Sequence, residues 1–334
     1  MTDLHPFIAG LPKAELHVHH VGSASPRIVA ELASRHPDSK VPSDPEAIAD
    51  YFTFTDFAHF IEVYLSVVDL VRTPEDVRLL TFEVARDMAR QNIRYAELTI
   101  TPYSSTRRGI EEKAFMAAIE DARKAAESEL GVILRWCFDI PGEAGLEAAA
   151  ETARLAVDLR PEGLVSFGLG GPEIGVPRPQ FKPYFDAARA AGLHSVPHAG
   201  ETTGPETVWD AIRELGAERI GHGTSATRDP ELLAYLAEHR IALEVCPTSN
   251  IATRAVTDLD PVSYTQQRRP ADVRLRPQQR VRGGRPPPRT RRARASAARQ
   301  ERRRGVLPGS GRKGEARRGD RHVHRRMAGA LTPR

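Results

Sequence analysis

Ala14-Glu15-Leu16-His17-Val18-His19 is the stretch that decides the fold of this chain. Alternate residues of a β-strand project from the same face, so in a strand the imidazoles of His17 and His19 stand side by side. Two imidazoles in that arrangement are suited to bind one metal ion. Two ordinary strand histidines give the same pattern, so the metal interpretation depends on further ligands elsewhere in the chain.

Three later fragments supply candidate ligands, because each is a short apolar run that ends in polar residues. They are Val196-Pro197-His198-Ala199-Gly200-Glu201, Arg219-Ile220-Gly221-His222-Gly223-Thr224 and Leu243-Glu244-Val245-Cys246-Pro247-Thr248-Ser249-Asn250. In barrels of parallel strands the chemistry lies at the C-terminal ends of the strands. The polar ends of these fragments are therefore expected to meet around His17 and His19.

With these motifs the chain resembles the adenosine deaminase family of zinc aminohydrolases. The family's first strand has nearly the same sequence as residues 11–19, its fifth ends in His-Ala-Gly-Glu, and its sixth carries Gly-His-Gly, all in the order found here. The likeness covers roughly residues 8–260. It implies a hydrolase of purine metabolism that deaminates a 6-aminopurine nucleoside of the adenosine type to the 6-oxo product and ammonia.

Strand-like and amphipathic helical runs alternate along the chain, which is typical of an α/β fold with a parallel sheet. Strands are expected near residues 14–21, 94–101, 132–140, 164–170, 194–199, 219–223 and 241–247, and helices near 74–90, 111–130, 147–159, 180–191, 205–215 and 230–239. Residues 42–70 are rich in aromatic side chains and are expected to form one helical segment that packs on the barrel or covers the substrate. With the resemblance, these elements imply a (β/α)8 TIM barrel of the metal-dependent hydrolase type, with its eighth strand missing or disrupted.

The resemblance also assigns roles to residues. It implies one zinc ion per subunit, with His17, His19 and His198 as protein ligands. Glu201 would protonate the purine N1 as hydroxide adds to C6, and His222 would orient the attacking water, so these two are the candidate catalytic residues. A carboxylate near a helix N-terminus and a hydrogen-bonded barrel histidine are the alternative interpretations of Glu201 and His222. His19 and Gly171 are the candidate substrate contacts, Gly171 through its backbone N–H to the purine N3.

One departure from the family pattern concerns the substrate. After the His-x-His pair the family usually has an apolar residue and then an Asp that hydrogen-bonds the ribose 5′-hydroxyl, whereas this chain has His20 and Val21. Val21 cannot accept that hydrogen bond, which favours a substrate with an apolar 5′ substituent. Adenine and 6-aminodeoxyfutalosine, an adenosine-like menaquinone precursor with a large aromatic 5′ group, are the alternative substrates, and Val21 favours the second.

A larger departure concerns the end of the barrel. The family's eighth strand ends in Asp-Asp-Pro, whose first Asp binds zinc and whose second reaches the purine N7, but no such pair follows Asn250. If Arg268 and Arg269 are CGA codons, reading one base later converts Arg-Arg-Pro-Ala-Asp-Val into Asp-Asp-Pro-Pro-Met-Phe. The same shift converts residues 277–281 into Leu-Asn-Asn-Glu-Tyr. We therefore expect that the C-terminal region is out of frame and that the enzyme in this form is impaired.

Charge divides the chain at the same place. The overall net charge of +4 hides a C-terminal region, residues 264–334, with 22 arginines and one lysine against four acidic residues. This region contains no Ile, Phe or Trp and cannot form a core of its own. We expect an incomplete barrel over residues 1–260 and a disordered basic tail over residues 261–334. An inactive barrel whose tail binds nucleic acid is the alternative, but the tail lacks interleaved aromatic residues, so we expect no nucleic-acid partner.

Cysteines and hydropathy restrict the remaining classes. Cys137 and Cys246 are far apart in expected strands, which excludes a disulfide framework and a cysteine-rich zinc site. No stretch approaches about 18 uninterrupted apolar residues, and the first residues lack the pattern of a signal peptide. We expect a cytoplasmic enzyme with a small purine nucleoside as its partner and no membrane contact, while the oligomeric state stays open.

Overall fold

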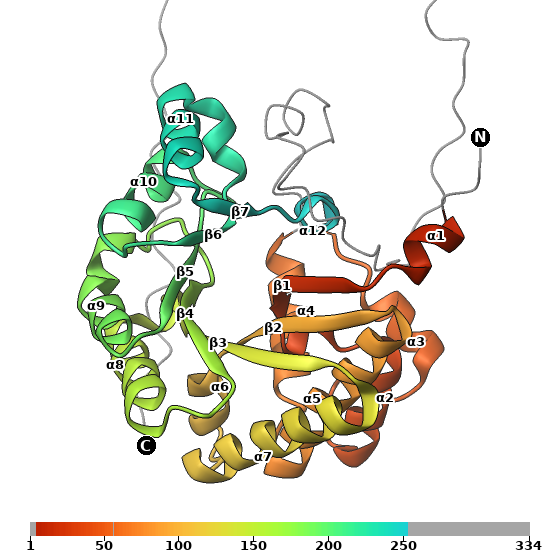
Figure 1. The fold of residues 1–334 in the computed structure, drawn as a ribbon. Helices are drawn as coiled ribbons and strands as arrows, with labels where there is room; N and C mark the ends of the chain where they lie inside the picture. The colour runs from red at the N-terminus through yellow and green to blue at the C-terminus, as the bar shows by residue number, and fades with distance from the viewer. Residues whose placement is uncertain (1–4, 56, 253–334) are drawn as a thin grey trace, which may run out of the picture. The chain divides into compact units, whose positions relative to one another are not determined.

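A curved sheet of parallel strands, surrounded by helices, forms the body of the protein (Figure 1). The computed structural model describes residues 5–55 and 57–252. In this part of the chain seven strands follow one another around the sheet in chain order: β1 (Lys13–His19), β2 (Ile93–Ile100), β3 (Ile133–Pro141), β4 (Leu164–Gly170), β5 (His194–Ala199), β6 (Arg219–His222) and β7 (Ala242–Glu244). The sheet is a nearly closed barrel with β1 and β7 at its edges, which confirms the predicted fold class.

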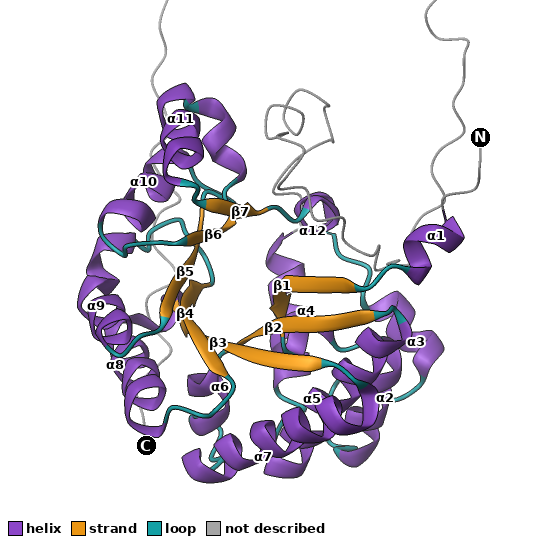
Figure 2. Ribbon diagram, in the orientation of Figure 1, coloured by secondary structure: helices purple, strands orange, loops and turns teal. Residues whose placement is uncertain are grey.

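Helices connect the strands, and most of them lie around the outside of the sheet (Figure 2). They are α1 (His5–Gly10), α2 (Pro26–Arg35), α3 (Pro45–Tyr51), α4 (Phe57–Val68), α5 (Pro74–Arg90), α6 (Pro102–Thr106), α7 (Glu112–Ala125), α8 (Gly145–Arg154), α9 (Lys182–Ala190), α10 (Pro205–Arg213), α11 (Pro230–His239) and α12 (Pro247–Ala252). Local sequence sets several of these boundaries. Thr73 and Asp76 form a reciprocal capping box at the start of α5, and Asp229 accepts two backbone N–H groups at the start of α11. None of the described helices is long and apolar enough to cross a membrane.

Successive side chains of each strand point alternately toward the surrounding helices and into the barrel. On β3, Trp136 and Phe138 are fully buried, and the Trp136 indole N–H donates to Glu120 on α7 at 2.7 Å. The intervening residues Cys137 and Asp139 point the other way, into the barrel, as the two-residue period of a strand requires. The outward apolar side chains and the helices form the core, and the inward polar ones are left for the site.

Three sequence predictions need correction. The strand expected at 241–247 is only the three-residue β7, which pairs with β6 alone among the described strands and so lacks a second neighbour to extend it. The aromatic segment forms two helices, α3 and α4, because the chain turns at Phe52–Thr55, where β-branched threonines disfavour the helix. The first strand ends at His19, since Val21–Ser23 forms a 3-10 turn.

The C-terminal predictions are not addressed by this part of the chain. The out-of-frame segment at 266–281, which is predicted to replace the eighth strand, and the basic tail at 261–334 both lie outside the described residues. The predicted division into a barrel and a tail therefore stays a prediction.

Candidate active site

Three histidines from opposite sides of the sheet converge at the C-terminal ends of β1 and β5. The Nε2 atom of His198 lies 3.1 Å from Nε2 of His17 and 3.1 Å from Nε2 of His19. His17 and His198 are buried, and His19 is half-buried. The structure thus brings together the three residues that the sequence singled out as candidate zinc ligands.

The outer nitrogens of these rings show which atoms are available to a metal. His198 Nδ1 donates to the backbone carbonyl of Leu169 at 2.9 Å, and His17 Nδ1 donates to the carboxylate of Glu244 at 3.0 Å. Both Nε2 atoms therefore carry lone pairs directed into the cluster. Burial lowers the pKa of His19 to about 4 and that of His198 well below its usual range, which favours the neutral, metal-binding form. Facing lone pairs repel each other unless a cation lies between them, so this donor set fits a zinc ion.

Glycine at position 221 is required for the histidines to approach. A Cβ atom there would lie 3.0 Å from Cε1 of His17 and 3.1 Å from Cγ of His198. Real Cβ contacts of this kind are rare, so any side chain would push the imidazoles apart. The first glycine of the Gly-His-Gly motif thus has a packing explanation.

His222 is held in an unusual backbone conformation at the end of β6. Its φ angle is +62°, in the left-handed region that non-glycine residues seldom adopt. Its Nδ1 donates to Oδ1 of Asn250 at 2.8 Å, which leaves Nε2 as an acceptor facing Glu201 at 3.6 Å. Asn250 is fully buried and fixes the orientation and tautomer of His222, a role that was not predicted from the sequence.

Glu201 lies on the loop after β5, and a second glutamate shapes that loop. Burial raises the pKa of Glu201, which favours its protonated form. Glu173 is buried and accepts backbone N–H groups from Gly200 and Thr202, each at 2.5 Å, and from Thr203 at 3.1 Å. The carboxylate of Glu173 therefore binds the loop on both sides of Glu201. The sequence signal for this role was the place of Glu173, two residues after the glycines at the end of β4.

A buried ionic network lies beneath the histidines. The other carboxylate oxygen of Glu244 accepts from Arg219 Nε at 2.8 Å, and Arg219 also pairs with Glu97. Glu97 in turn accepts from the hydroxyl of Tyr95 at 3.0 Å. The network thus connects side chains of β2, β6 and β7, and through Glu244 it reaches His17 on β1. Glu244 was not predicted as a site residue, although an acidic residue inside the apolar run Leu243–Val245 was a visible signal.

Cys137 and Cys246 are not joined by a disulfide bond. Cys246 lies after β7 rather than within a strand, and its sulfur belongs to a cluster with His17 and His222 whose potential ligand atoms are within 4.8 Å of one another. This single thiol does not make a cysteine-rich site.

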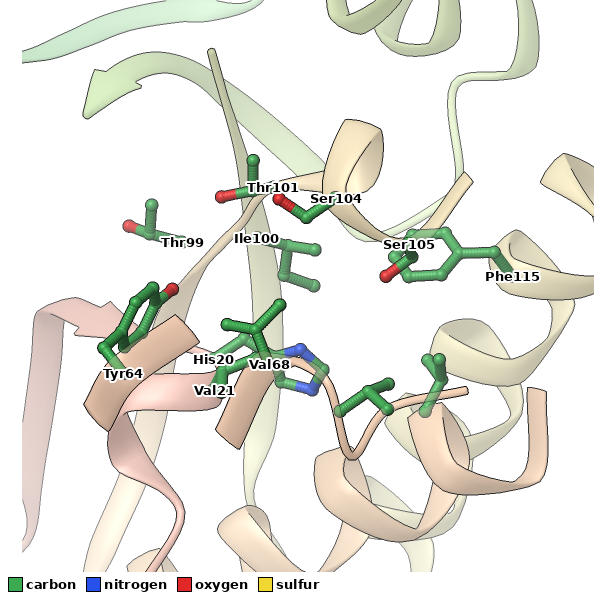
Figure 3. Close-up of a pocket in the computed structure, with 12 residues that line it drawn as sticks. His20, Val21, Tyr64, Val68, Thr99, Ile100, Thr101, Ser104, Ser105 and Phe115 are labelled. Carbon is green, nitrogen blue, oxygen red and sulfur yellow. The ribbon is translucent and has the colours of Figure 1, made fainter. Parts of the chain in front are cut away.

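The predicted substrate contacts lie at the mouth of the barrel. Gly171 follows β4 with a φ of +81°, and a Cβ there would lie 2.1 Å from a carboxylate oxygen of Glu143. The positive φ angle favours glycine at this position, and the Glu143 carboxylate lies close to it. Nearby, Val21 lines a pocket with Tyr64 and Val68, and Thr101 lies across it (Figure 3).

Comparison with known proteins identifies the kind of enzyme that carries this site. The sequence model of the family described as "Adenosine deaminase" matches residues 12–269. This chain belongs to the adenosine deaminase family. An aminodeoxyfutalosine deaminase from Streptomyces avermitilis is 84% identical over 260 residues, which cover 77% of this chain and 73% of that protein. An adenine deaminase from Stutzerimonas stutzeri is 34% identical over 260 residues, with 77% and 81% covered.

A solved structure connects the family to the metal. An amidohydrolase from Burkholderia ambifaria, with bound Zn, has a TM-score of 0.70 and 26% identity, with 80% of this chain and 73% of that chain covered. Members of the adenosine deaminase family are metal-dependent amidohydrolases, so this protein is a metal-dependent hydrolase that deaminates an aminopurine-type substrate. The family match ends at residue 269, so residues 270–334 lie outside it.

Proposed function

We propose that this deaminase acts on 6-aminodeoxyfutalosine and converts its 6-amino group to a 6-oxo group with release of ammonia. The observation that carries the proposal is the 84% identity to an aminodeoxyfutalosine deaminase, against 34% to an adenine deaminase over a similar length. This substrate replaces the adenosine-type main interpretation of the sequence, and adenosine and adenine become the competing substrates of the test.

The surroundings of Val21 support the same choice. The described residues that line its small pocket include no carboxylate; they are valines, Ile100, Tyr64 and Phe115 together with the polar His20, Thr99, Thr101, Ser104 and Ser105. A ribose 5′-hydroxyl would find no anionic acceptor there, and the Val21 side chain itself offers only methyl groups. The absence of a carboxylate at position 21 therefore favours a nucleoside whose 5′ substituent needs no anionic acceptor.

The proposed metal site supplies the nucleophile. His17, His19 and His198 would hold the zinc ion, which when bound would supply the acidity that makes hydroxide accessible from water at neutral pH. The His222 imidazole has its Nδ1 proton committed to Asn250, which leaves Nε2 to accept a proton from the attacking water. A new C6–O bond forms and the C6–N bond breaks, and the amine takes up the proton that His222 accepted from the water and leaves as ammonia.

Glu201 is the proposed acid of this reaction. Because burial raises the pKa of its carboxyl group, Glu201 holds a proton closer to neutral pH than an exposed glutamate does. It can give that proton to the purine N1 as C6 is attacked, which places the developing charge on a hydrogen-bonded nitrogen. Glu173 holds the loop on both sides of Glu201 and so directs its side chain. One zinc ion per subunit satisfies this arrangement.

Steady-state kinetics test the proposal. The zinc-loaded 334-residue chain and a version with the restored C-terminal frame are assayed with 6-aminodeoxyfutalosine, adenosine and adenine. We expect kcat/KM for 6-aminodeoxyfutalosine to exceed the other two by about 10- to 100-fold, since a hydroxyl left unpaired costs about 1–3 kcal/mol. A higher kcat/KM for adenosine or adenine in the frame-restored enzyme would overturn the assignment.

A further inference from the structure

Asp139 is a buried carboxyl group that the proposed reaction does not use. It lies near the C-terminal end of β3, points into the barrel and is only 3% exposed. The hydroxyl of Thr101, which follows β2, donates to Oδ1 of Asp139 at 2.7 Å. Burial raises the pKa of Asp139 to about 7, so ionisation of this group opposes folding at neutral pH. A residue retained at such a cost suggests a ligand rather than a packing role.

The neighbouring strand contributes bare backbone beside this carboxyl group. Gly168 and Gly170 of β4 present no side chains to Asp139, and a Cβ at Gly170 would lie 2.5 Å from Oδ2 of Asp139. A Cβ at Gly168 would lie 3.2 Å from Cβ of Asp139. The second carboxylate oxygen therefore lies against bare backbone, next to the segment that continues to Gly171.

The proposed purine position brings the sugar to the same place. If the backbone N–H of Gly171 meets N3, then N9 and the sugar attached to it lie on the same side of the base, because N3 and N9 are both bonded to C4. Asp139 is adjacent to that segment through Gly170. Thr101 and Tyr64 line the pocket of Val21, and burial together with the charge of Asp139 raises the pKa of Tyr64 (Figure 3).

We infer that Asp139, oriented by Thr101, binds the 2′- and 3′-hydroxyl groups of the substrate's sugar. A carboxylate offers two acceptor oxygens, which suit two adjacent hydroxyl groups, and such bonds to a charged acceptor are strong. Val21 lacks an acceptor of its own, so the sugar must find one elsewhere at the mouth of the barrel. This inference rests on the proposed function, because it assumes a purine nucleoside whose base contacts Gly171.

Binding of matched product-like ligands tests the inference without turnover. The zinc-loaded full chain is titrated by calorimetry with hypoxanthine, 5′-deoxyinosine and 2′,3′,5′-trideoxyinosine, and the same titrations are made with Asp139→Asn. We expect the wild type to bind 5′-deoxyinosine about 10-fold or more tighter than the trideoxy compound. Asp139→Asn should reduce that ratio to about 3-fold or less and leave hypoxanthine affinity unchanged.

Two further variants separate binding from folding. Glu143→Gln removes a carboxylate that also lies beside Gly171, and it should leave the hydroxyl-dependent ratio intact. Thr101→Val removes the hydrogen bond that orients Asp139 and should also reduce the ratio of the two affinities. It is the deciding variant if thermal unfolding shows that Asp139→Asn does not fold. An undiminished ratio in the folded Asp139→Asn variant, or in Thr101→Val when the first does not fold, would overturn the inference.

The same titrations distinguish a failure of the sugar site from a failure of the proposed function. If the wild type binds all three compounds with equal affinity, the sugar site is wrong while a purine enzyme remains. If it binds none of them, both the sugar site and the proposed function fail for this chain. Equal weakening of hypoxanthine and 5′-deoxyinosine by Asp139→Asn would show a structural role instead.

Discussion

His17 Nδ1 on β1 and Glu244 Oε2 on β7 lie 3.0 Å apart and join the two edge strands of the nearly closed barrel. Both side chains are buried, and Glu244 is also bound by Arg219. The contact therefore does two things at once: it directs Nε2 of His17 into the histidine cluster, and it connects the strands where the described sheet is open.

Glu244→Gln should weaken zinc binding, because the neutral amide loses the charge that supports the Nδ1 proton of His17 and pairs with Arg219. Loss of such an outer partner typically costs about 10- to 100-fold in metal affinity. Competition with a chelator measures the change. Glu97→Gln alters the same network without touching His17, so it is the matched control, and an equal loss in both variants would contradict a direct role for Glu244.

Asp139 should make stability fall as pH rises. Its pKa in the folded protein is about 7, against an ordinary value of 3.8, so between these values the folded state holds a proton that the unfolded state has released. This group therefore opposes folding progressively from about pH 4 to pH 7, by up to about 4 kcal/mol.

Asp139→Asn removes that titration. Its stability relative to wild type should be higher at pH 8 than at pH 5, whatever constant cost the loss of the Thr101 contact brings. Denaturant unfolding at the two pH values measures the difference. A relative stability that is the same at both pH values would show that the carboxyl group ionises normally.

The sequence predicted the order of the described strands and the meeting of His17, His19 and His198, because periodicity and motif order are local properties of the chain. The sequence did not predict the side chains that hold these histidines in their orientation. Glu244 contacts His17 across 227 positions of sequence, and the role of Asp139 depends on glycines of the neighbouring strand. Such contacts arise only when the strands are placed side by side. β7 was overestimated for a related reason, since the length of an edge strand depends on its neighbours.

The genomic DNA under residues 266–281 should encode an Asp-Asp-Pro segment when it is read one base later. The prediction follows from the arginines at 268 and 269, and it agrees with the end of the family match at residue 269. Sequencing of this region decides it. AGG or CGC codons at the two positions would exclude the frame change, and the arginine-rich region would then need another explanation.

The chain as written should bind zinc more weakly than a frame-restored version and should turn over slowly. Three imidazoles are present, but the carboxylate that the family adds to them is absent from the sequence after Asn250. Metal content after dialysis and the rate of ammonia release compare the two proteins. Equal zinc retention and equal rates would show that the restored segment contributes nothing to the site.

Val21→Asp in the frame-restored enzyme should shift preference toward adenosine. The new carboxylate would supply an anionic acceptor for the ribose 5′-hydroxyl in a pocket whose described lining contains no carboxylate, and it would place a charge against an apolar 5′ substituent. We expect the ratio of kcat/KM for adenosine to that for 6-aminodeoxyfutalosine to rise about 10- to 100-fold. Val21→Asn, which is similar in size but uncharged, is the control and should produce a smaller shift. If neither variant changes the ratio, position 21 does not contact the 5′ group, and another side chain of the pocket must determine the substrate.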